Sequence, residues 1–207
     1  MRALTGDVAA RRRSRLLLLA GPAAVVLAWA VIGVSWALNP WFSFLDHAFS
    51  DLGSERASRP WVYNYGLILV GLLACIYSLG VYVNGVTKME GFASALMFVA
   101  GLFLAFIGVF PAGTRPHVFV STWFFVQMGL SLIVLGAAMR ARGLPLGRLV
   151  SLVSVTGFIV YGLVESSIGW PSVAAGEAFG IAVIDVAVLA SALSYYRNAM
   201  GPASSPQ

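Results

Sequence analysis

The sequence predicts an all-α membrane protein: a polytopic bundle of six transmembrane helices with one short amphipathic helix at the membrane–water interface. Two observations support this fold class. Apolar residues make up 59% of the 207-residue chain and charged residues 10%, too few to give a soluble core of this size a polar shell. In addition, six apolar segments are long enough to cross a bilayer at about 1.5 Å per residue. Short connectors between them predict antiparallel neighbours.

The expected spans cover residues 16–38, 61–83, 91–111, 117–139, 149–168 and 174–196. A basic, signal-like stretch precedes the first span, but the apolar run from Leu16 to about Leu38 is too long for a cleaved signal peptide. We therefore expect it to remain as a span. The fifth span is the least regular, because Glu165, Ser166 and Ser167 interrupt its end.

The distribution of Lys and Arg predicts the orientation of the bundle. Ten of these residues fall in one set of tails and loops, and three fall in the other. The first set holds Arg2, Arg11, Arg12, Arg13, Arg15, Lys88, Arg140, Arg142, Arg148 and Arg197, and the second holds Arg56, Arg59 and Arg115. Basic loops stay preferentially in the cytoplasm. We therefore predict a plasma-membrane protein with cytoplasmic tails, 1–15 and 197–207, around a single membrane domain, 16–196.

This orientation places most of the remaining polar residues on the extracytoplasmic side. They lie at or near the outer ends of the expected spans, and they include both histidines and five of the eight acidic residues. The candidate ligand-binding residues are Asp46, His47, Ser50, Asp51, Asn64, Arg115, His117, Glu165 and Glu177. Such clustering predicts an outward-facing polar site.

The connector after the first span carries several of these residues. Asn39 followed by Pro40 is a typical helix start, and Gly53 is a typical stop. A helix over about 40–52 would place Ser43, Asp46, His47, Ser50 and Asp51 on one arc and Phe42, Phe44, Leu45, Phe49 and Leu52 on the opposite face. This pattern predicts an interfacial amphipathic helix. In the alternative interpretation, its acids only cap neighbouring helix ends or pair with Arg56 and Arg59.

Three stretches resemble a known family. They are "NPWFSFLDHAFSDLGS" from Asn39, "WVYNYGLILVGLL" from Trp61 and "GVFPAGTRPH" ending at His117. Together with "AAGEAFGIAV" around Glu177, they resemble the uncharacterised membrane-protein family called domain of unknown function 998. The resemblance implies a six-helix membrane protein, distantly similar to the Frag1/DRAM/Sfk1 group. It singles out Ser50, Asp51, Asn64, His117 and Glu177 as the family's polar positions, and it implies no known reaction.

Several functions fit these residues. The first is binding of a membrane lipid or a lipid-like ligand at the outward-facing site. The second is a metal-dependent hydrolase acting on an outer-leaflet lipid, in which Asp51, His117 and Glu177 would be catalytic residues or ligands of a divalent metal such as zinc. General acid–base chemistry by Asp51 or Glu177 with His117 is a related alternative. No cofactor is firmly indicated.

The third function is proton- or ion-coupled transport, which depends on Asp185 near the middle of the last span. An ionisable residue at that depth needs a cavity or a partner. Asp185 could equally accept a hydrogen bond from a Ser, Trp or Tyr on a neighbouring span. The excess of basic residues is explained by topology, so we expect no nucleic-acid partner.

The orientation can be tested by protease treatment of intact cells. Because the N-terminal tail is expected in the cytoplasm, a protease added outside should leave it uncut until the membrane is permeabilised. Cleavage within the tail of intact cells would contradict the predicted orientation.

Overall fold

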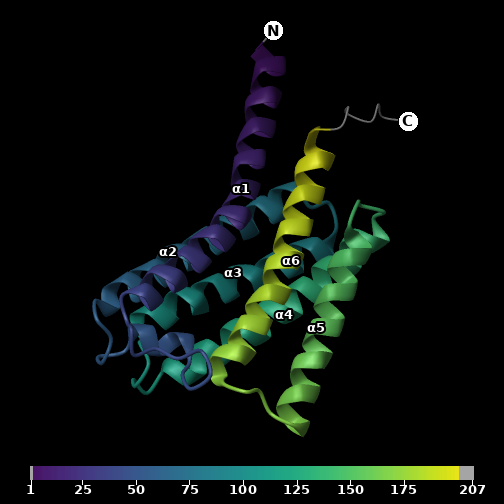
Figure 1. Ribbon diagram of the computed structural model, residues 1–207. Coiled ribbons are helices and arrows are strands. Elements are labelled where there is room, and N and C mark those ends of the chain that lie inside the picture. The colour runs from purple at the N-terminus through teal and green to yellow at the C-terminus, as the bar shows by residue number, and fades with distance from the viewer. Residues whose placement is uncertain (1, 201–207) are drawn as a thin grey trace.

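The structure is a computed structural model that describes residues 2–200. Within this range the chain forms six α-helices, one short 3₁₀ helix and no strand (Figure 1). The elements are α1 (Arg2–Ala37), η1 (Phe49–Gly53), α2 (Pro60–Asn84), α3 (Lys88–Val109), α4 (His117–Ala141), α5 (Gly147–Ser167) and α6 (Val173–Met200). The all-α fold class is therefore confirmed.

All six helices are long and apolar enough to cross a membrane. The candidate spans are Ser14–Ala37, Pro60–Asn84, Lys88–Val109, His117–Ala141, Gly147–Ser167 and Val173–Asn198. Each overlaps a span expected from the sequence, including the irregular fifth one. The chain is thus a multi-pass integral membrane protein.

The helices are arranged in chain order around the bundle. Each helix packs against the next, and α6 returns to pack against α1, which closes the ring. Helix α6 also contacts α2 and α4. Because the number of helices is even, the start of α1 and the end of α6 lie at the same end of the bundle (Figure 1). We call this the terminal end, and the opposite end, which holds the connector between α1 and α2, the cap end.

Packing around the ring is uneven. Helices α2 and α3 approach at backbone distance: a Cβ atom on Gly71 would lie 2.5 Å from the Ala105 nitrogen and 2.6 Å from the Gly101 oxygen. Small residues allow such close helix contacts in membranes. Helix α5 is packed far less: 17% of its apolar 18-residue segment is buried, against 56% of the corresponding segment of α2. One wall of the bundle is therefore tight and another is loose.

The prediction of an amphipathic α-helix over 40–52 is wrong. Residues 38–47 form a series of turns, Ala48 is extended, and only Phe49–Gly53 is helical, as the 3₁₀ helix η1. The Asn39 side chain explains the difference. Its Oδ1 accepts hydrogen bonds from the Ser58 amide at 2.6 Å and from Trp41 Nε1 at 3.0 Å. Asn39 therefore joins the two ends of the connector instead of starting a helix.

Besides its own turns, this connector, residues 38–59, has two backbone carbonyls that accept hydrogen bonds from the start of α6. The Phe44 carbonyl accepts from Ser172 Oγ at 2.6 Å, and the His47 carbonyl accepts from the Ala174 amide at 3.0 Å. These bonds replace the local ones that an α-helix would make. We refer to residues 38–59 as the cap.

The cap closes one end of the bundle. Its residues Phe42, Phe49 and Leu52 are buried in the main hydrophobic core, whereas Leu45 is 64% exposed. Three of the five side chains predicted for the apolar face are thus fully buried, but they pack on protein. The cap therefore packs over the helix ends and does not lie on a lipid surface as a helix.

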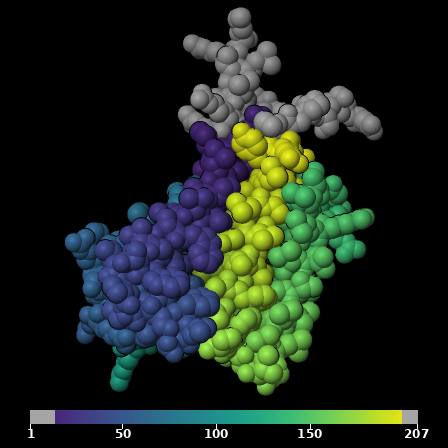
Figure 2. All heavy atoms as spheres, viewed as in Figure 1, coloured from purple at the N-terminus to yellow at the C-terminus, as the bar shows by residue number. Residues whose placement is uncertain are grey.

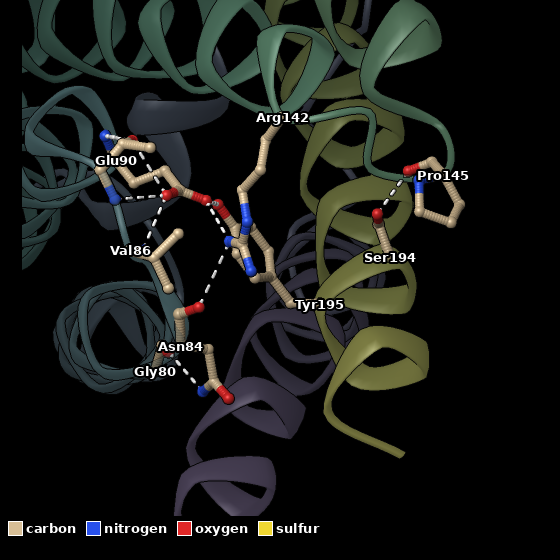
Figure 3. Close-up of polar contacts among 9 residues, drawn as sticks. Gly80, Asn84, Val86, Glu90, Arg142, Pro145, Ser194 and Tyr195 are labelled. Carbon is tan, nitrogen blue, oxygen red and sulfur yellow. Dashed lines mark hydrogen bonds and ion pairs between the residues drawn. The ribbon is translucent and has the colours of Figure 1, made fainter. Parts of the chain in front are cut away.

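At the terminal end, a buried carboxylate joins three parts of the chain (Figure 3). Glu90 is fully buried, and its two oxygens accept five hydrogen bonds. The donors are the Val86 amide, the Thr87 amide and hydroxyl, Arg142 Nη1 and Tyr195 OH. The Arg142 and Tyr195 contacts are each 2.6 Å long. Glu90 therefore ties the α2–α3 connector and α3 to the end of α4 and to α6.

Replacing Glu90 by Ala should destabilise the fold strongly. The change leaves Arg142, Tyr195 and two backbone amides without their acceptor, and removing one partner of a buried ion pair costs about 3–5 kcal/mol. Thermal unfolding of the purified protein in detergent measures the loss. The matched control is Glu55→Ala in the exposed part of the cap, which should leave the midpoint unchanged. Equal stability of the two variants would contradict this role of Glu90.

Candidate functional site

Two of the predicted site residues, Asp51 and Glu177, meet at the cap. Asp51 Oδ2 accepts a hydrogen bond from the Ala48 amide at 2.9 Å, and Glu177 Oε2 accepts from the Phe49 amide at 2.7 Å. Two carboxylates thus pair with consecutive amides at the start of η1, where negative charge is favourable. Glu177 comes from α6, so it fixes the cap to a helix 128 positions further along the chain.

Tyr63, Ser50 and Asn64 lie beneath this pair. Tyr63 and Ser50 are buried, and Tyr63 lies within electrostatic reach of both carboxylates. Asn64 Nδ2 donates to the Gly53 carbonyl at 3.0 Å. A side chain at Gly53 would collide with Tyr63 and Asn64, so the glycine is required for the close approach of η1 to α2.

His47 belongs to a different part of the cap. Its Nδ1 lies 3.0 Å from the Ser43 amide, and its Nε2 lies 3.1 Å from Arg56 Nη2. The Arg56 guanidinium in turn stacks 4.0 Å above the Trp41 ring. Because 40–52 is not an α-helix, His47 and Asp51 do not share the helical arc predicted for them. His47 supports the fold of the cap, and Asp46 beside it is exposed.

His117 has a structural partner of its own. The buried ring places Nδ1 2.9 Å from the Phe110 carbonyl and Nε2 3.5 Å from Ser121 Oγ. Since a carbonyl can only accept, Nδ1 carries the proton in this contact. The bond closes the connector between α3 and α4.

Arg115 is exposed on the connector between α3 and α4, and Glu165 is exposed near the end of α5, so neither joins the other candidates. Among the side chains that the structure describes, residues 14–198, no three of His, Cys, Asp or Glu gather closely enough to hold a metal ion. Asp51, His117 and Glu177 therefore do not form the three-ligand metal site considered from the sequence.

Asp185 accepts a hydrogen bond from Trp29 Nε1 at 2.7 Å. The alternative of a Trp donor on a neighbouring span is thus confirmed, and α1 supplies it. The contact lies where α6 packs against α1, in the spanning part of both helices. It gives this carboxylate the partner that an ionisable residue needs at membrane depth.

Two cavities open inside the bundle. The central cavity, about 100 Å³, lies beneath the cap, and Ser50, Tyr63, Glu177 and Asp185 are its main polar lining residues. The lateral cavity, about 360 Å³, lies between α4, α5 and α6. Both are lined by Ser121, Phe125, Glu177 and Ile184. Glu177 therefore holds the cap and at the same time forms part of the wall between the cavities.

The lateral cavity has an apolar, partly aromatic wall. Phe125, Phe158, Tyr161 and Phe179 supply the aromatic surface, and glycines supply the remaining space. A Cβ atom on Gly162 would meet no atom within 4 Å. Phe158 is 46% exposed, so the cavity reaches the outer surface of α5. This surface lies beside α6 on one face of the molecule (Figure 2).

One polar group in this wall lacks a partner. The Ser154 side chain is 2% exposed, and its hydroxyl has no hydrogen-bond partner among the described residues. Nothing in the sequence distinguishes Ser154 from the other serines of the spans. Tyr63 and Ser121 were also missed, because their place at the cavities depends on helix packing. For Glu90, the spacing Thr87-x-x-Glu90 is typical of a capping box, but it does not reveal the distant partners.

The fold and the site define a class: a six-helix integral membrane protein with a non-helical cap and cavities between its helices. Comparison with known families gives a group within that class. The profile of the family described as "Protein of unknown function (DUF998)" matches residues 22–194, and the chain belongs to this family. No curated protein and no solved structure matches the chain. The relation to the Frag1/DRAM/Sfk1 group stays a prediction.

Substitutions of Glu177 test its hold on the cap. Glu177→Ala leaves the Phe49 amide without an acceptor, which should cost about 1–3 kcal/mol and speed hydrogen exchange of amides 48–52. Glu177→Gln keeps an oxygen acceptor, so it should preserve most of the protection. Exchange measured by mass spectrometry in detergent distinguishes the variants. Wild-type protection in Glu177→Ala would show that the cap is held by other contacts.

Proposed function

We propose that this protein binds a lipid-like amphiphile inside the bundle, with the aliphatic chain in the lateral cavity and the polar end at Glu177. The observation that supports the proposal best is the combination of an apolar, aromatic wall with a single carboxylate at its cap end. Small-molecule sites are typically apolar clefts of about 300–1,000 Å³ with a few polar groups that fix orientation. The lateral cavity, about 360 Å³, falls in this range.

Its position also favours a ligand that comes from the bilayer. The lining residues Phe158, Tyr161 and Gly162 are exposed on α5, the least buried of the six helices. An aliphatic chain can reach the cavity from the hydrocarbon phase without crossing the cap.

Binding is favoured over the other two functions by the contacts of the candidate residues. Asp51 and His117 pair with backbone groups at separate connectors, which leaves no converging set for a hydrolase. The transport hypothesis requires Asp185, and this carboxylate is hydrogen-bonded to Trp29.

A cavity-filling substitution tests the proposal. The probe is a twelve-carbon alcohol that carries a photoactivatable diazirine, with labelled residues mapped by mass spectrometry. In the wild type, adducts should concentrate on the α4, α5 and α6 residues that line the lateral cavity. Gly162→Phe places a ring in the cavity, and it should reduce labelling there on the order of tenfold, equivalent to about 1.4 kcal/mol.

The matched control is Gly33→Phe. Gly33 is an exposed helical glycine of α1 whose added Cβ would likewise meet nothing within 4 Å, and it lines neither cavity. This variant should label like the wild type. Adducts spread evenly over all outward faces, or equal labelling of both variants, would refute binding in the lateral cavity.

A further inference from the structure

We infer that the ligand of the lateral cavity is a cationic amphiphile, with an ammonium head at Glu177 and a second hydrogen-bonding group near Ser154. This inference rests on the proposed function, and it adds the chemical class of the ligand. Three features of the structure lead to it: the sign of the charge in the cavities, the free acceptor capacity of Glu177, and the unpaired hydroxyl of Ser154.

The charge that lines the two cavities has one sign. Among the described residues, Glu177 and Asp185 are the acids that line the two cavities, and no Lys, Arg or His lines either of them. The basic residues at the cap end do not reach the cavities. Arg56 of the cap contacts His47 and Trp41, and Arg59 of the cap and Arg115 of the connector between α3 and α4 are exposed. A fatty acid or a phosphate head would meet only negative charge, whereas an ammonium head would be attracted.

The Glu177 carboxylate can accept more than it receives. It has two oxygens with about four acceptor sites, and its hydrogen bond from the Phe49 amide uses one of them. Within the described side chains, no Lys or Arg forms an ion pair with it. The groups near it, the Asp51 carboxylate and the Tyr63 phenol, supply no positive charge. Glu177 is partly buried, and a carboxylate withdrawn from water is costly unless it is paired; a ligand ammonium group would provide the partner.

Ser154 indicates a second polar group on the ligand. Among the described residues, Ser35, Ser154 and Trp170 each carry a buried polar atom without a hydrogen-bond partner. Of these three, only Ser154 lines a cavity. Ser154 and Tyr161 are two turns apart on α5, about 10 Å along its axis, and Glu177 lies near the cap-side end of the same cavity. A hydroxyl or carbonyl part-way along the chain would satisfy the serine.

Competition for the photoactivatable alcohol tests the head group. Dodecylamine, dodecanol and dodecanoic acid share one chain length and differ in charge. We expect dodecylamine to displace the probe on the order of tenfold better than dodecanoic acid. Glu177→Gln keeps the acceptor for Phe49 but removes the charge, so it should abolish the preference for the amine. The control Glu165→Gln changes an exposed acid outside both cavities and should retain the preference.

A second variant tests the role of Ser154. A dodecylamine with a hydroxyl on its sixth carbon should compete several-fold better than plain dodecylamine in the wild type, and equally well in Ser154→Ala. Without ligand, Ser154→Ala should keep or raise the midpoint of thermal unfolding, because it removes an unpaired polar group. Ser131→Ala, which removes a buried hydroxyl bonded to the Ala93 carbonyl, should lower it.

The outcomes separate the two levels of the proposal. If the alcohol labels the lateral cavity but the amine competes no better than the acid, or if Glu177→Gln keeps the preference, the cationic ligand is refuted while binding of an amphiphile stands. If the alcohol does not label the cavity, the proposed function itself fails. Equal competition by the two amines in the wild type would refute the role of Ser154 alone.

Discussion

The need to satisfy backbone hydrogen bonds outside the helices governs the two ends of this bundle. A buried amide or carbonyl without a partner is costly, and inside a membrane there is no water to replace it. The cap and the connector between α2 and α3 are therefore held by side-chain acceptors from their own segment or from another. Asn39, Asp51 and Glu177 do this for the cap, and Glu90 does it at the terminal end. These four polar side chains thus accept from backbone amides that lie outside the α-helices.

The same arrangement leaves one side of the bundle loosely covered. Helices α2 and α3 pack at backbone distance through glycines, and α1 and α6 close the ring. Helix α5 has short connectors and little buried surface, and the space between it, α4 and α6 is the lateral cavity. A tight core thus supports a loosely covered wall, and under the proposed function that wall is the binding site.

The sequence predicted the spans well, because their hydrophobic signal is local and long. It predicted the cap wrongly, since Asn39-Pro40 has the local pattern of a helix start while the Asn39 side chain bonds to Ser58. The polar residues at the cap end were predicted as one group, but only Ser50, Asp51, Asn64 and Glu177 lie together. His47 and His117 bond to their own connectors instead. Glu90 and Ser154 depend on contacts between distant helices, which no local pattern contains.

The double position of Glu177 has a thermodynamic consequence. Its carboxylate accepts the Phe49 amide of the cap and also lines both cavities. Any ligand that contacts this carboxylate therefore has a coupling free energy with closure of the cap, and linkage makes that coupling reciprocal. A ligand that strengthens the hold of Glu177 on Phe49 would close the cap more firmly, and one that competes for the oxygen would loosen it. Occupancy of a cavity within the membrane would then change how firmly the cap is closed at the end of the bundle.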